Sequence, residues 1–222
     1  MLSVVATPIG NLEDITLRAI RTLKEADFVV AEDTRHSGIL LKKYEIATQQ
    51  LSFHSHSPES QLEKLGQLLL EGKNLALISD AGTPGISDPG FLLIQKAIEL
   101  NVPVTAIPGP SAVITALVVS GLPTHRFLYL GYLPLKKGRK KLIAELAAFP
   151  HTIVLYEAPH RILRTLEELL QSVGADRKIA VCREMTKMFE EIFRGTITEA
   201  ASHFKTKSPR GEFTVVLSGA TL

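Results

Sequence analysis

The 222-residue sequence has a single cysteine, Cys182, and almost no excess of either charge, since 25 Lys and Arg against 23 Asp and Glu give a formal net charge of +2. One thiol excludes an intramolecular disulfide and a cysteine cluster for zinc, and it fits a reducing compartment best. The small net charge excludes a histone-like nucleic-acid binder. Any contact with nucleic acid must therefore come from a local basic patch.

Long apolar segments are also missing. The N-terminus lacks the basic start and the apolar run of about 7 to 15 residues that a signal peptide needs. The most apolar later stretch, 112–119, is much shorter than the roughly 20 residues that cross a bilayer. We therefore expect a cytoplasmic protein that does not enter the membrane. Because 45% of the residues are hydrophobic, disordered and fibrous classes are excluded, and one large core or two modest ones can form.

The first half of the sequence repeats one pattern: a short β-branched run, a turn rich in Gly, Pro and Asp, and a segment with helical apolar spacing. This pattern predicts parallel βαβ units, with strands covered by helices on both faces. The expected strands are Leu2–Ala6, Phe28–Ala31, Asn74–Ser79 and Val104–Ile107. Capping side chains predict two helix starts, one at Asp14 and one at Ser57, which precedes a proline.

The pattern changes after the turn at Ser120–Pro123. The later strands lie close together with only two substantial helices between them, which suits a mixed or antiparallel sheet. These strands are Phe127–Tyr132, Thr152–Tyr156, Lys178–Arg183, Glu190–Gly195 and Glu212–Leu217. The sequence therefore predicts an α/β fold with two α/β domains, residues 1–120 with a mainly parallel sheet and residues 121–222 with a mixed sheet.

Three loops rich in Gly and Pro follow predicted strands of the first half, at Thr7–Asn11, Asp80–Gly85 and Pro108–Ala112. In an open parallel sheet such loops gather at the carboxyl edge, where ligands bind. The alternative is that they are ordinary turns between strands and helices. The glycine-rich nucleotide fingerprints are missing, and Asp80 and Asp88 flank the second loop. These carboxylates disfavour a polyphosphate and favour a neutral or cationic ligand.

Two short polar segments carry further candidate side chains. Ala31–His36 sets two carboxylates, a guanidinium and an imidazole at a strand end, which suits acid–base chemistry or phosphate positioning. A helix cap, with Arg35 paired to a carboxylate, explains the same residues equally well. His54 and His56 lack a third metal ligand, so a polar substrate rim is favoured and no metal site is expected. Cys182 lies in an apolar strand and is interpreted as structural.

A basic run, Lys136–Lys141, gathers five cations in six positions just after Tyr129 and Tyr132. Backbone phosphates are natural partners for such a run. The alternative is a solvated loop and helix start, although cations oppose the helix dipole at that end. We interpret the run as an RNA contact made by Lys136, Lys137, Arg139, Lys140 and Lys141.

The order of these motifs along the chain closely resembles one family. The matching segments are Pro8–Thr16, Ala31–His36, Ser79–Pro84, Ser87–Gly90, Pro108–Ala112, Tyr156–Glu157, His160–Arg161, Arg183–Lys187 and Gly211–Thr214. Together they resemble the ribosomal RNA small subunit methyltransferase I family, a group of the tetrapyrrole methylase superfamily. The resemblance spans essentially the whole chain.

This resemblance implies S-adenosylmethionine as the methyl donor and a cytidine ribose 2′-hydroxyl of small-subunit (16S) ribosomal RNA as the acceptor. It also implies a homodimer and two α/β domains with the donor in the cleft between them. The residues that it assigns to donor binding are Pro8, Asp80, Ala81, Gly82, Thr83, Ser111, Ala112, Tyr156, Glu157, Arg183, Glu212, Phe213 and Thr214. A sulfonium cation suits the carboxylate of Asp80.

Methyl transfer to a ribose hydroxyl needs a group that takes its proton. We expect Asp33 or His36 to act as this base, with Arg35 bound to an adjacent phosphate. Two features differ from the family: many members continue beyond the last predicted strand into a small helical region, and Ser57 stands where relatives often have asparagine. The rival hypotheses are a methylase of the same superfamily that acts on a porphyrin-like small molecule, and a non-catalytic RNA-binding module.

Overall fold

The continuous apolar runs of the first half form a parallel sheet. In the computed structural model, which describes residues 1–206 and 209–220, five strands lie in the order β3-β2-β4-β1-β5, and all neighbouring pairs are parallel. These strands are β1 (Leu2–Val5), β2 (Phe28–Ala31), β3 (Gln50–Ser52), β4 (Leu75–Leu77) and β5 (Val104–Ile107). The predicted parallel sheet is confirmed. Only β3, a short and mostly polar edge strand, has no counterpart among the expected strands.

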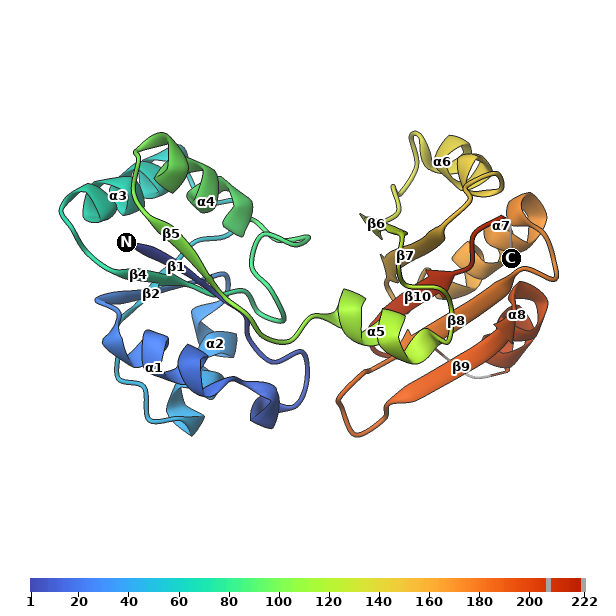
Figure 1. Cartoon of the computed structure of the whole chain (residues 1–222), viewed down its shortest axis with the longest axis horizontal. Helices are drawn as coiled ribbons and strands as arrows, with labels where there is room; N and C mark the ends of the chain where they lie inside the picture. Colours follow the sequence, from blue (N-terminus) through green and yellow to red (C-terminus); the bar gives the residue numbers. More distant parts are fainter. Residues whose placement is uncertain (207–208, 221–222) are drawn as a thin grey trace. The chain divides into compact units, whose positions relative to one another are not determined.

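Helices cover both faces of this first sheet, as the apolar strands require. A short 3-10 helix η1 (Leu12–Asp14) precedes α1 (Leu17–Glu25), and α2 (Thr34–Lys43), α3 (Glu59–Leu70) and α4 (Gly90–Glu99) follow. Side chains of α1 and α2 fill one core cluster, and those of α3 and α4 fill another. Figure 1 shows α1 and α2 on one side of the strands and α3 and α4 on the other. The carboxyl edge of the sheet stays free for loops.

Both predicted helix starts are wrong by one or two residues. The N-cap of α1 is Thr16, whose hydroxyl accepts a hydrogen bond from Ala19 N at 3.1 Å, whereas Asp14 ends the preceding 3-10 helix. Ser57 does not cap α3, because its hydroxyl accepts from His54 N at 2.9 Å and closes the turn before the helix. In both places a competing local hydrogen bond decides where the helix begins.

The second half forms a mixed sheet in the order β6-β7-β10-β8-β9. The strands are β6 (Phe127–Tyr132), β7 (Thr152–Glu157), β8 (Lys178–Arg183), β9 (Glu191–Thr196) and β10 (Phe213–Leu217). The pair β6 and β7 is parallel, and the other pairs are antiparallel. The predicted mixed sheet is confirmed.

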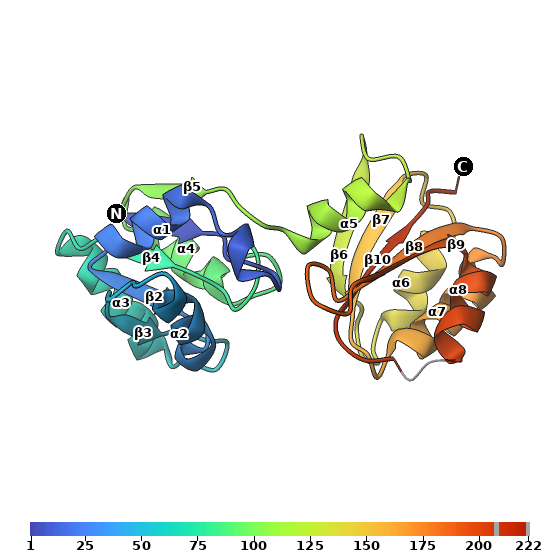
Figure 2. The ribbon, with the colours of Figure 1, turned by 90° about the horizontal axis from the view of Figure 1, so that it is seen from below.

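Four helices cover the second sheet. Figure 2 shows α6 (Arg139–Leu146), α7 (Ile162–Val173) and α8 (Ile197–Lys205) on one face and α5 (Ala112–Ser120) on the other. Among the described residues after the predicted boundary there are thus three helices instead of the expected two. The core between the sheet and α6, α7 and α8 includes Phe204, Phe213 and Leu166, which are at most 2% exposed.

The chain divides into two compact units, Met1–Ser111 and Ala112–Leu222. This division moves the expected boundary from Ser120 to Ser111. The nine residues of α5 belong to the second unit, because this helix packs against strands of the second sheet. Its apolar sequence indicates burial but does not specify which sheet buries it. Within the described residues, no helix combines the length and the apolar composition that crossing a bilayer demands.

Candidate active site

The first two predicted loops are joined by backbone hydrogen bonds at the carboxyl edge of the first sheet. Thr7 N donates to the Gly82 carbonyl at 2.9 Å, and Gly82 N donates to the Thr7 carbonyl at 3.1 Å. The Thr7 hydroxyl also donates to the Ser79 carbonyl at 3.1 Å. These bonds form because β1 and β4 are neighbours, so the turns that follow them emerge side by side. The loops Thr7–Asn11 and Asp80–Gly85 therefore form one surface, as predicted.

The third loop lies against the same surface. Thr83 Oγ1 donates to the Pro110 carbonyl at 3.4 Å. Gly109 approaches β1 so closely that a Cβ atom there would lie 2.9 Å from the Cβ of Ala6. Gly82 has a φ of +81°, in the left-handed region that favours glycine. Glycine at these two positions lets the three loops converge on one edge.

The candidate donor-binding residues of these loops differ in exposure. The structure buries Pro8 and Gly82, leaves Asp80, Thr83 and Ser111 half-buried, and exposes Ala81. Ala112 is the first residue of α5 and belongs to the second unit. The accessible groups of this edge are therefore the Asp80 carboxylate, the Thr83 hydroxyl and the loop backbone.

Two carboxylates from neighbouring strands converge beside the loops. Asp80 Oδ1 accepts a hydrogen bond from Asp33 N at 3.1 Å, which ties the end of β2 to the end of β4. Glu32, the first residue after β2, is half-buried at this point. Burial raises the pKa of Glu32, the charges of Asp80, Asp88 and Asp33 raise it further, and His54 lowers it. Glu32 therefore keeps its proton to a higher pH than an ordinary surface glutamate does.

Asp33 itself is occupied by the start of α2. Its Oδ1 accepts from Arg35 N at 2.8 Å and from Arg35 Nε at 3.0 Å, and its Oδ2 lies 2.7 Å from Arg35 Nη2. The Arg35 side chain, and then its backbone N–H, hold the pKa of Asp33 far below its usual range. Such a carboxylate is a weak base, so the structure favours the helix-cap interpretation for Asp33 and points away from its expected role as the proton acceptor.

The other polar residues of this segment remain on the surface. Arg35 has a side chain that is 90% exposed despite its pairing with Asp33, and His36 in the first turn of α2 is exposed. Sequence reasoning selected Asp33 and overlooked Glu32, although the end of the apolar run at Ala31 marks Glu32 as the first residue to leave the sheet.

His54 and His56 are exposed after β3, with ring centroids 6.4 Å apart. His56 N donates to Nδ1 of His54 at 3.2 Å. Across residues 1–206 and 209–220, no group of three or more His, Cys, Asp or Glu side chains is arranged to hold a metal ion. His54 stabilises the charged form of Glu32, and the role of the two histidines in a polar substrate rim stays a prediction.

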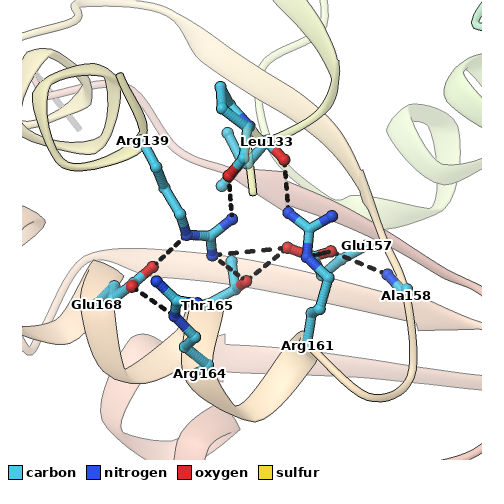
Figure 3. A network of polar contacts seen from close by, with 9 residues as sticks. Leu133, Arg139, Glu157, Ala158, Arg161, Arg164, Thr165 and Glu168 are labelled. Atoms are coloured by element: carbon cyan, nitrogen blue, oxygen red, sulfur yellow. Dashed lines mark hydrogen bonds and ion pairs between the residues drawn. The ribbon is translucent and has the colours of Figure 1, made fainter. Parts of the chain in front are cut away.

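Arg139, one of the cations expected to contact RNA, is buried in the second unit. It is 1% exposed. Figure 3 shows its guanidinium pointing from α6 toward Thr165 and Glu168 of α7. Nε lies 2.6 Å from Glu168 Oε2, and Nη2 donates to Thr165 Oγ1 at 2.7 Å. Nη2 also lies 3.8 Å from a Glu157 carboxylate oxygen. A buried guanidinium with these partners does not reach an RNA phosphate, so the assignment of Arg139 to RNA binding is wrong.

Glu157, expected to bind the methyl donor, belongs to the same network and is 1% exposed. Its carboxylate accepts from the Thr165 hydroxyl at 2.5 Å and from Ala158 N at 3.0 Å, and it lies 3.1 Å from Arg161 Nε (Figure 3). Internal donors thus occupy both carboxylate oxygens, and the expected contact of Glu157 with the methyl donor stays a prediction.

The four lysines of the basic run are exposed, in contrast to Arg139 between them. They are Lys136, Lys137, Lys140 and Lys141. Charge pattern alone groups all five cations, but α6 turns one of them inward and leaves the other four in solvent. The predicted basic patch therefore persists with four members.

Tyr156 on β7 contacts both tyrosines that precede the basic run in the sequence. The ring of Tyr156 is 5.4 Å from that of Tyr129 and 5.6 Å from that of Tyr132, measured between centroids. Burial raises the pKa of Tyr156, and Tyr129 adds to the effect. Tyr156 is therefore a neutral, half-buried aromatic side chain, whereas Tyr132 is 51% exposed.

The remaining candidates of the second unit lie at the adjoining ends of β8 and β10. Arg183 Nη1 is 3.2 Å from Glu191 Oε2, and Arg183 Nε donates to the Arg210 carbonyl at 2.7 Å. Glu212 Oε2 lies 2.9 Å from Lys187 Nζ. Two further candidates have buried side chains within β10, namely Phe213 and Thr214. Their expected contact with the methyl donor stays a prediction.

Cys182 is fully buried in β8, and burial raises the pKa of its thiol to about 11. Because the thiolate is the reactive form, iodoacetamide at pH 8 is expected to leave the native protein unlabelled and to label it fully after denaturation. Intact-mass spectrometry measures both states. Rapid labelling of the native protein would contradict the structural role of this residue.

A family model described as Tetrapyrrole (Corrin/Porphyrin) Methylases matches residues 1–201. The ribosomal RNA small subunit methyltransferase I of Thermotoga maritima is 47% identical over 218 residues, which cover 98% of this chain and 98% of that protein. The chain belongs to the ribosomal RNA small subunit methyltransferase I family of tetrapyrrole methylases. A second member, from Synechocystis, is 48% identical over 222 residues, which cover 100% of this chain and 80% of the relative.

Solved structures agree with this family in fold. The methyltransferase CobJ superposes with a TM-score of 0.73 at 18% identity, and 99% of this chain and 94% of that chain are covered. Uroporphyrin-III C-methyltransferase from Thermus thermophilus, in a complex with S-adenyl homocysteine, gives a TM-score of 0.67 at 20% identity, with 99% and 97% covered. These likenesses confirm the tetrapyrrole methylase fold of this methyltransferase.

Proposed function

We propose that this methyltransferase transfers a methyl group from S-adenosylmethionine to a cytidine ribose 2′-hydroxyl of small-subunit ribosomal RNA. The observation that carries the proposal is the 47% identity over nearly the whole of both chains with a relative named for ribosomal RNA. A cytoplasmic homodimer is part of the same proposal and follows from the family resemblance. Sedimentation of the purified protein tests the dimer, and a monomer at micromolar concentration would contradict it.

The first unit fits a sulfonium donor chemically. Its loop edge presents the Asp80 carboxylate, and backbone carbonyls of the loops lie around Gly82 and Pro110. Acceptor oxygens of this kind stabilise a positive charge and repel a polyphosphate. Gly109 lies so close to Ala6 that any larger side chain there would collide with it. S-adenosylmethionine supplies the methyl group when bound, and the candidate residues toward it are Pro8, Asp80, Ala81, Gly82, Thr83, Ser111, Ala112, Tyr156, Glu157, Arg183, Glu212, Phe213 and Thr214.

We assign removal of the ribose proton to Glu32, in place of Asp33. A general base must hold a free lone pair at neutral pH and still accept a proton, so its pKa is best placed close to the working pH. Asp33 uses its lone pairs on Arg35 and on the α2 backbone, whereas burial raises the pKa of Glu32 above its ordinary value. The exposed imidazole of His36 is the alternative base, and Arg35 is left to contact an RNA phosphate.

The chain's own residues also orient the acceptor. The Asp80 carboxylate accepts a hydrogen bond from Asp33 N. This bond fixes the end of β2, where Glu32 is the next residue. The bidentate Asp33–Arg35 pair fixes the guanidinium at the surface. Positioning of this kind is the main contribution that a protein makes to an in-line displacement.

Binding of S-adenosylmethionine is expected to raise the melting temperature of the protein, because a ligand that binds only the folded state stabilises it. At a donor concentration about 100 times the dissociation constant, the gain in free energy of unfolding is about 2.7 kcal/mol. Scanning calorimetry with and without donor measures the shift. An unchanged melting temperature, together with no heat when the protein is titrated with S-adenosylmethionine, would contradict the assignment of this compound as the methyl donor.

The rival hypotheses are separated by methyl counting. With tritiated donor, we expect label in small-subunit ribosomal RNA and none in a porphyrin-like substrate such as uroporphyrinogen. Label in the tetrapyrrole alone would favour the small-molecule methylase. RNA binding without donor binding or label would favour a non-catalytic RNA-binding module.

A further inference from the structure

We propose that Tyr132 stacks on an unpaired base of the RNA, on a segment that Arg139 and Arg161 hold in place beside the four exposed lysines. This inference rests on the proposed function and deepens it, because it assigns a base contact and a support for the RNA-binding surface. The surface consists of Tyr132, Lys136, Lys137, Lys140 and Lys141, and it is called here the basic–aromatic surface.

The ring of Tyr132 is exposed enough to contact a base, and a neighbouring ring restricts its orientation. The residue is 51% exposed at the end of β6, and its ring contacts that of Tyr156 at 5.6 Å with an interplanar angle of 58°. The contact with Tyr156 restricts the ring on one side, while the exposed half faces solvent. A half-exposed aromatic ring with a fixed orientation loses little conformational entropy when a base stacks on it.

The exposed lysines follow Tyr132 in the sequence, and ion pairs within the described residues do not account for their grouping. Within the described part of the chain, Lys141 is the one member of the four within 4.0 Å of a carboxylate, that of Glu145 on the next turn of α6. The cations also stand at the N-terminal end of α6, where the helix dipole disfavours positive charge. A polyanion would relieve both the mutual repulsion and the unfavourable dipole.

Two largely buried arginines fix the backbone between the ring and the lysines. Arg161 Nη2 donates to the Leu133 carbonyl at 2.5 Å, and Arg139 Nη1 donates to the Pro134 carbonyl at 3.2 Å. Both guanidinium groups form ion pairs with Glu157 (Figure 3). Leu133 is itself 2% exposed. Hydrogen bonds from the two largely buried guanidinium groups therefore fix the backbone of the segment that carries the basic–aromatic surface.

The chemistry of this surface matches single-stranded RNA. Proteins that bind single strands combine cations along the backbone with aromatic side chains on which bases stack, and such stacking tolerates any base. A duplex hides its bases from a lone tyrosine, and a lipid surface or a plain polyanion would not require the ring. Arg139 and Arg161 act as positioning residues here, because they touch the segment and not the RNA.

The test compares three full-length surface variants with the wild-type protein. Tyr132→Ala is expected to weaken binding of a 12-nucleotide single-stranded RNA about tenfold, while Tyr132→Phe, which keeps the ring, binds like the wild type. Leu135→Ala is the matched control, because Leu135 is a comparably exposed apolar residue of the same segment at 65% exposure. Fluorescence anisotropy at several salt concentrations measures each affinity.

Inorganic polyphosphate separates stacking from charge, because it carries phosphates without bases. Tyr132→Ala is expected to leave polyphosphate binding and the salt dependence of RNA binding unchanged. Replacing all four lysines by glutamine is expected to weaken the binding of both RNA and polyphosphate. The lysine variant should also reduce the slope of log K against log salt by about 0.7 for each RNA phosphate that the protein no longer neutralises. Arg139→Met is expected to weaken RNA binding with this lysine set intact, and circular dichroism checks that the variant is folded.

The inference would be overturned if Tyr132→Ala bound RNA as tightly as the wild type does. It would also be overturned if this variant lost affinity for polyphosphate as much as for RNA, or lost affinity for S-adenosylmethionine only. If the wild type neither binds nor methylates ribosomal RNA, the proposed function falls. If the wild type methylates and Tyr132→Ala is indistinguishable from it, only the inference about the basic–aromatic surface falls.

Discussion

Replacing Glu32 by glutamine is expected to lower single-turnover methyl transfer at saturating RNA and donor by about 10²- to 10⁴-fold, the usual contribution of a general base. The amide has the same shape but takes no proton. Donor affinity should be unchanged, because the substitution leaves the backbone hydrogen bond between Asp33 and Asp80 intact. Rapid-quench measurement of labelled RNA and titration calorimetry give the two quantities.

Asp33→Asn is the matched control. Asparagine keeps a side-chain oxygen that can cap α2, so the start of this helix should survive. Because Arg35 already occupies the Asp33 carboxylate, we expect only a small loss of the transfer rate. A severe loss in Asp33→Asn or in His36→Gln, with Glu32→Gln active, would move the base to that residue.

The same substitution of Glu32 is expected to stabilise the protein at neutral pH. Burial and the charges of Asp80, Asp88 and Asp33 raise the pKa of Glu32 in the folded state, while His54 opposes them. A carboxylate with a raised folded-state pKa loses its stabilising contribution as the pH rises through that value. Glutamine escapes this loss, so the advantage of Glu32→Gln in urea denaturation should vanish on acidification below the ordinary glutamate pKa. The acidic limb of the wild-type rate profile should likewise lie above that ordinary value.

Arg139→Ala is expected to lower the free energy of unfolding by about 3 kcal/mol or more. Removing one partner of a buried ion pair leaves the other charge unpaired, which typically costs about 3–5 kcal/mol. Glu157 keeps Arg161, so the lower end of this range applies. Lys140→Ala, one position along the chain and exposed, should change stability by less than about 0.5 kcal/mol. Urea denaturation followed by circular dichroism compares the two variants.

A double-mutant cycle separates the ion pair from simple loss of packing. If the carboxylate of Glu157 is destabilising once Arg139 is gone, Glu157→Gln should cost much less in the Arg139→Ala background than in the wild type. Additive losses would show that Arg139 contributes through packing alone. Equal stability of Arg139→Ala and Lys140→Ala would contradict the burial of this residue.

The core of each sheet could be predicted from the sequence because local pattern and tertiary structure agree there. Continuous apolar runs predict the strands of the parallel sheet, and closely spaced strands predict the mixed one. The polar edge strand Gln50–Ser52 carries no such pattern, since it pairs on one side only. The helix 112–120 is apolar on all sides, and its pattern therefore indicates burial without specifying the sheet.

The side-chain errors have a common origin, because charge pattern does not reveal burial or pairing. In the run 136–141 the helical repeat turns Arg139 toward Thr165 and Glu168, which are far away in sequence. At the end of β2, the choice between Glu32 and Asp33 depends on Arg35 and on carboxylates of another strand. The convergence of the three loops was predictable, because the carboxyl ends of parallel strands lie at one edge of the sheet.

Mass spectrometry of small-subunit ribosomal RNA treated with the enzyme and isotopically labelled S-adenosylmethionine tests the central claim most directly. After nuclease digestion, we predict one labelled methyl group on the ribose of a cytidine, present with the wild type and greatly reduced with Glu32→Gln. Label on a base, on a ribose other than that of cytidine, or on no nucleotide at all would contradict the assignment.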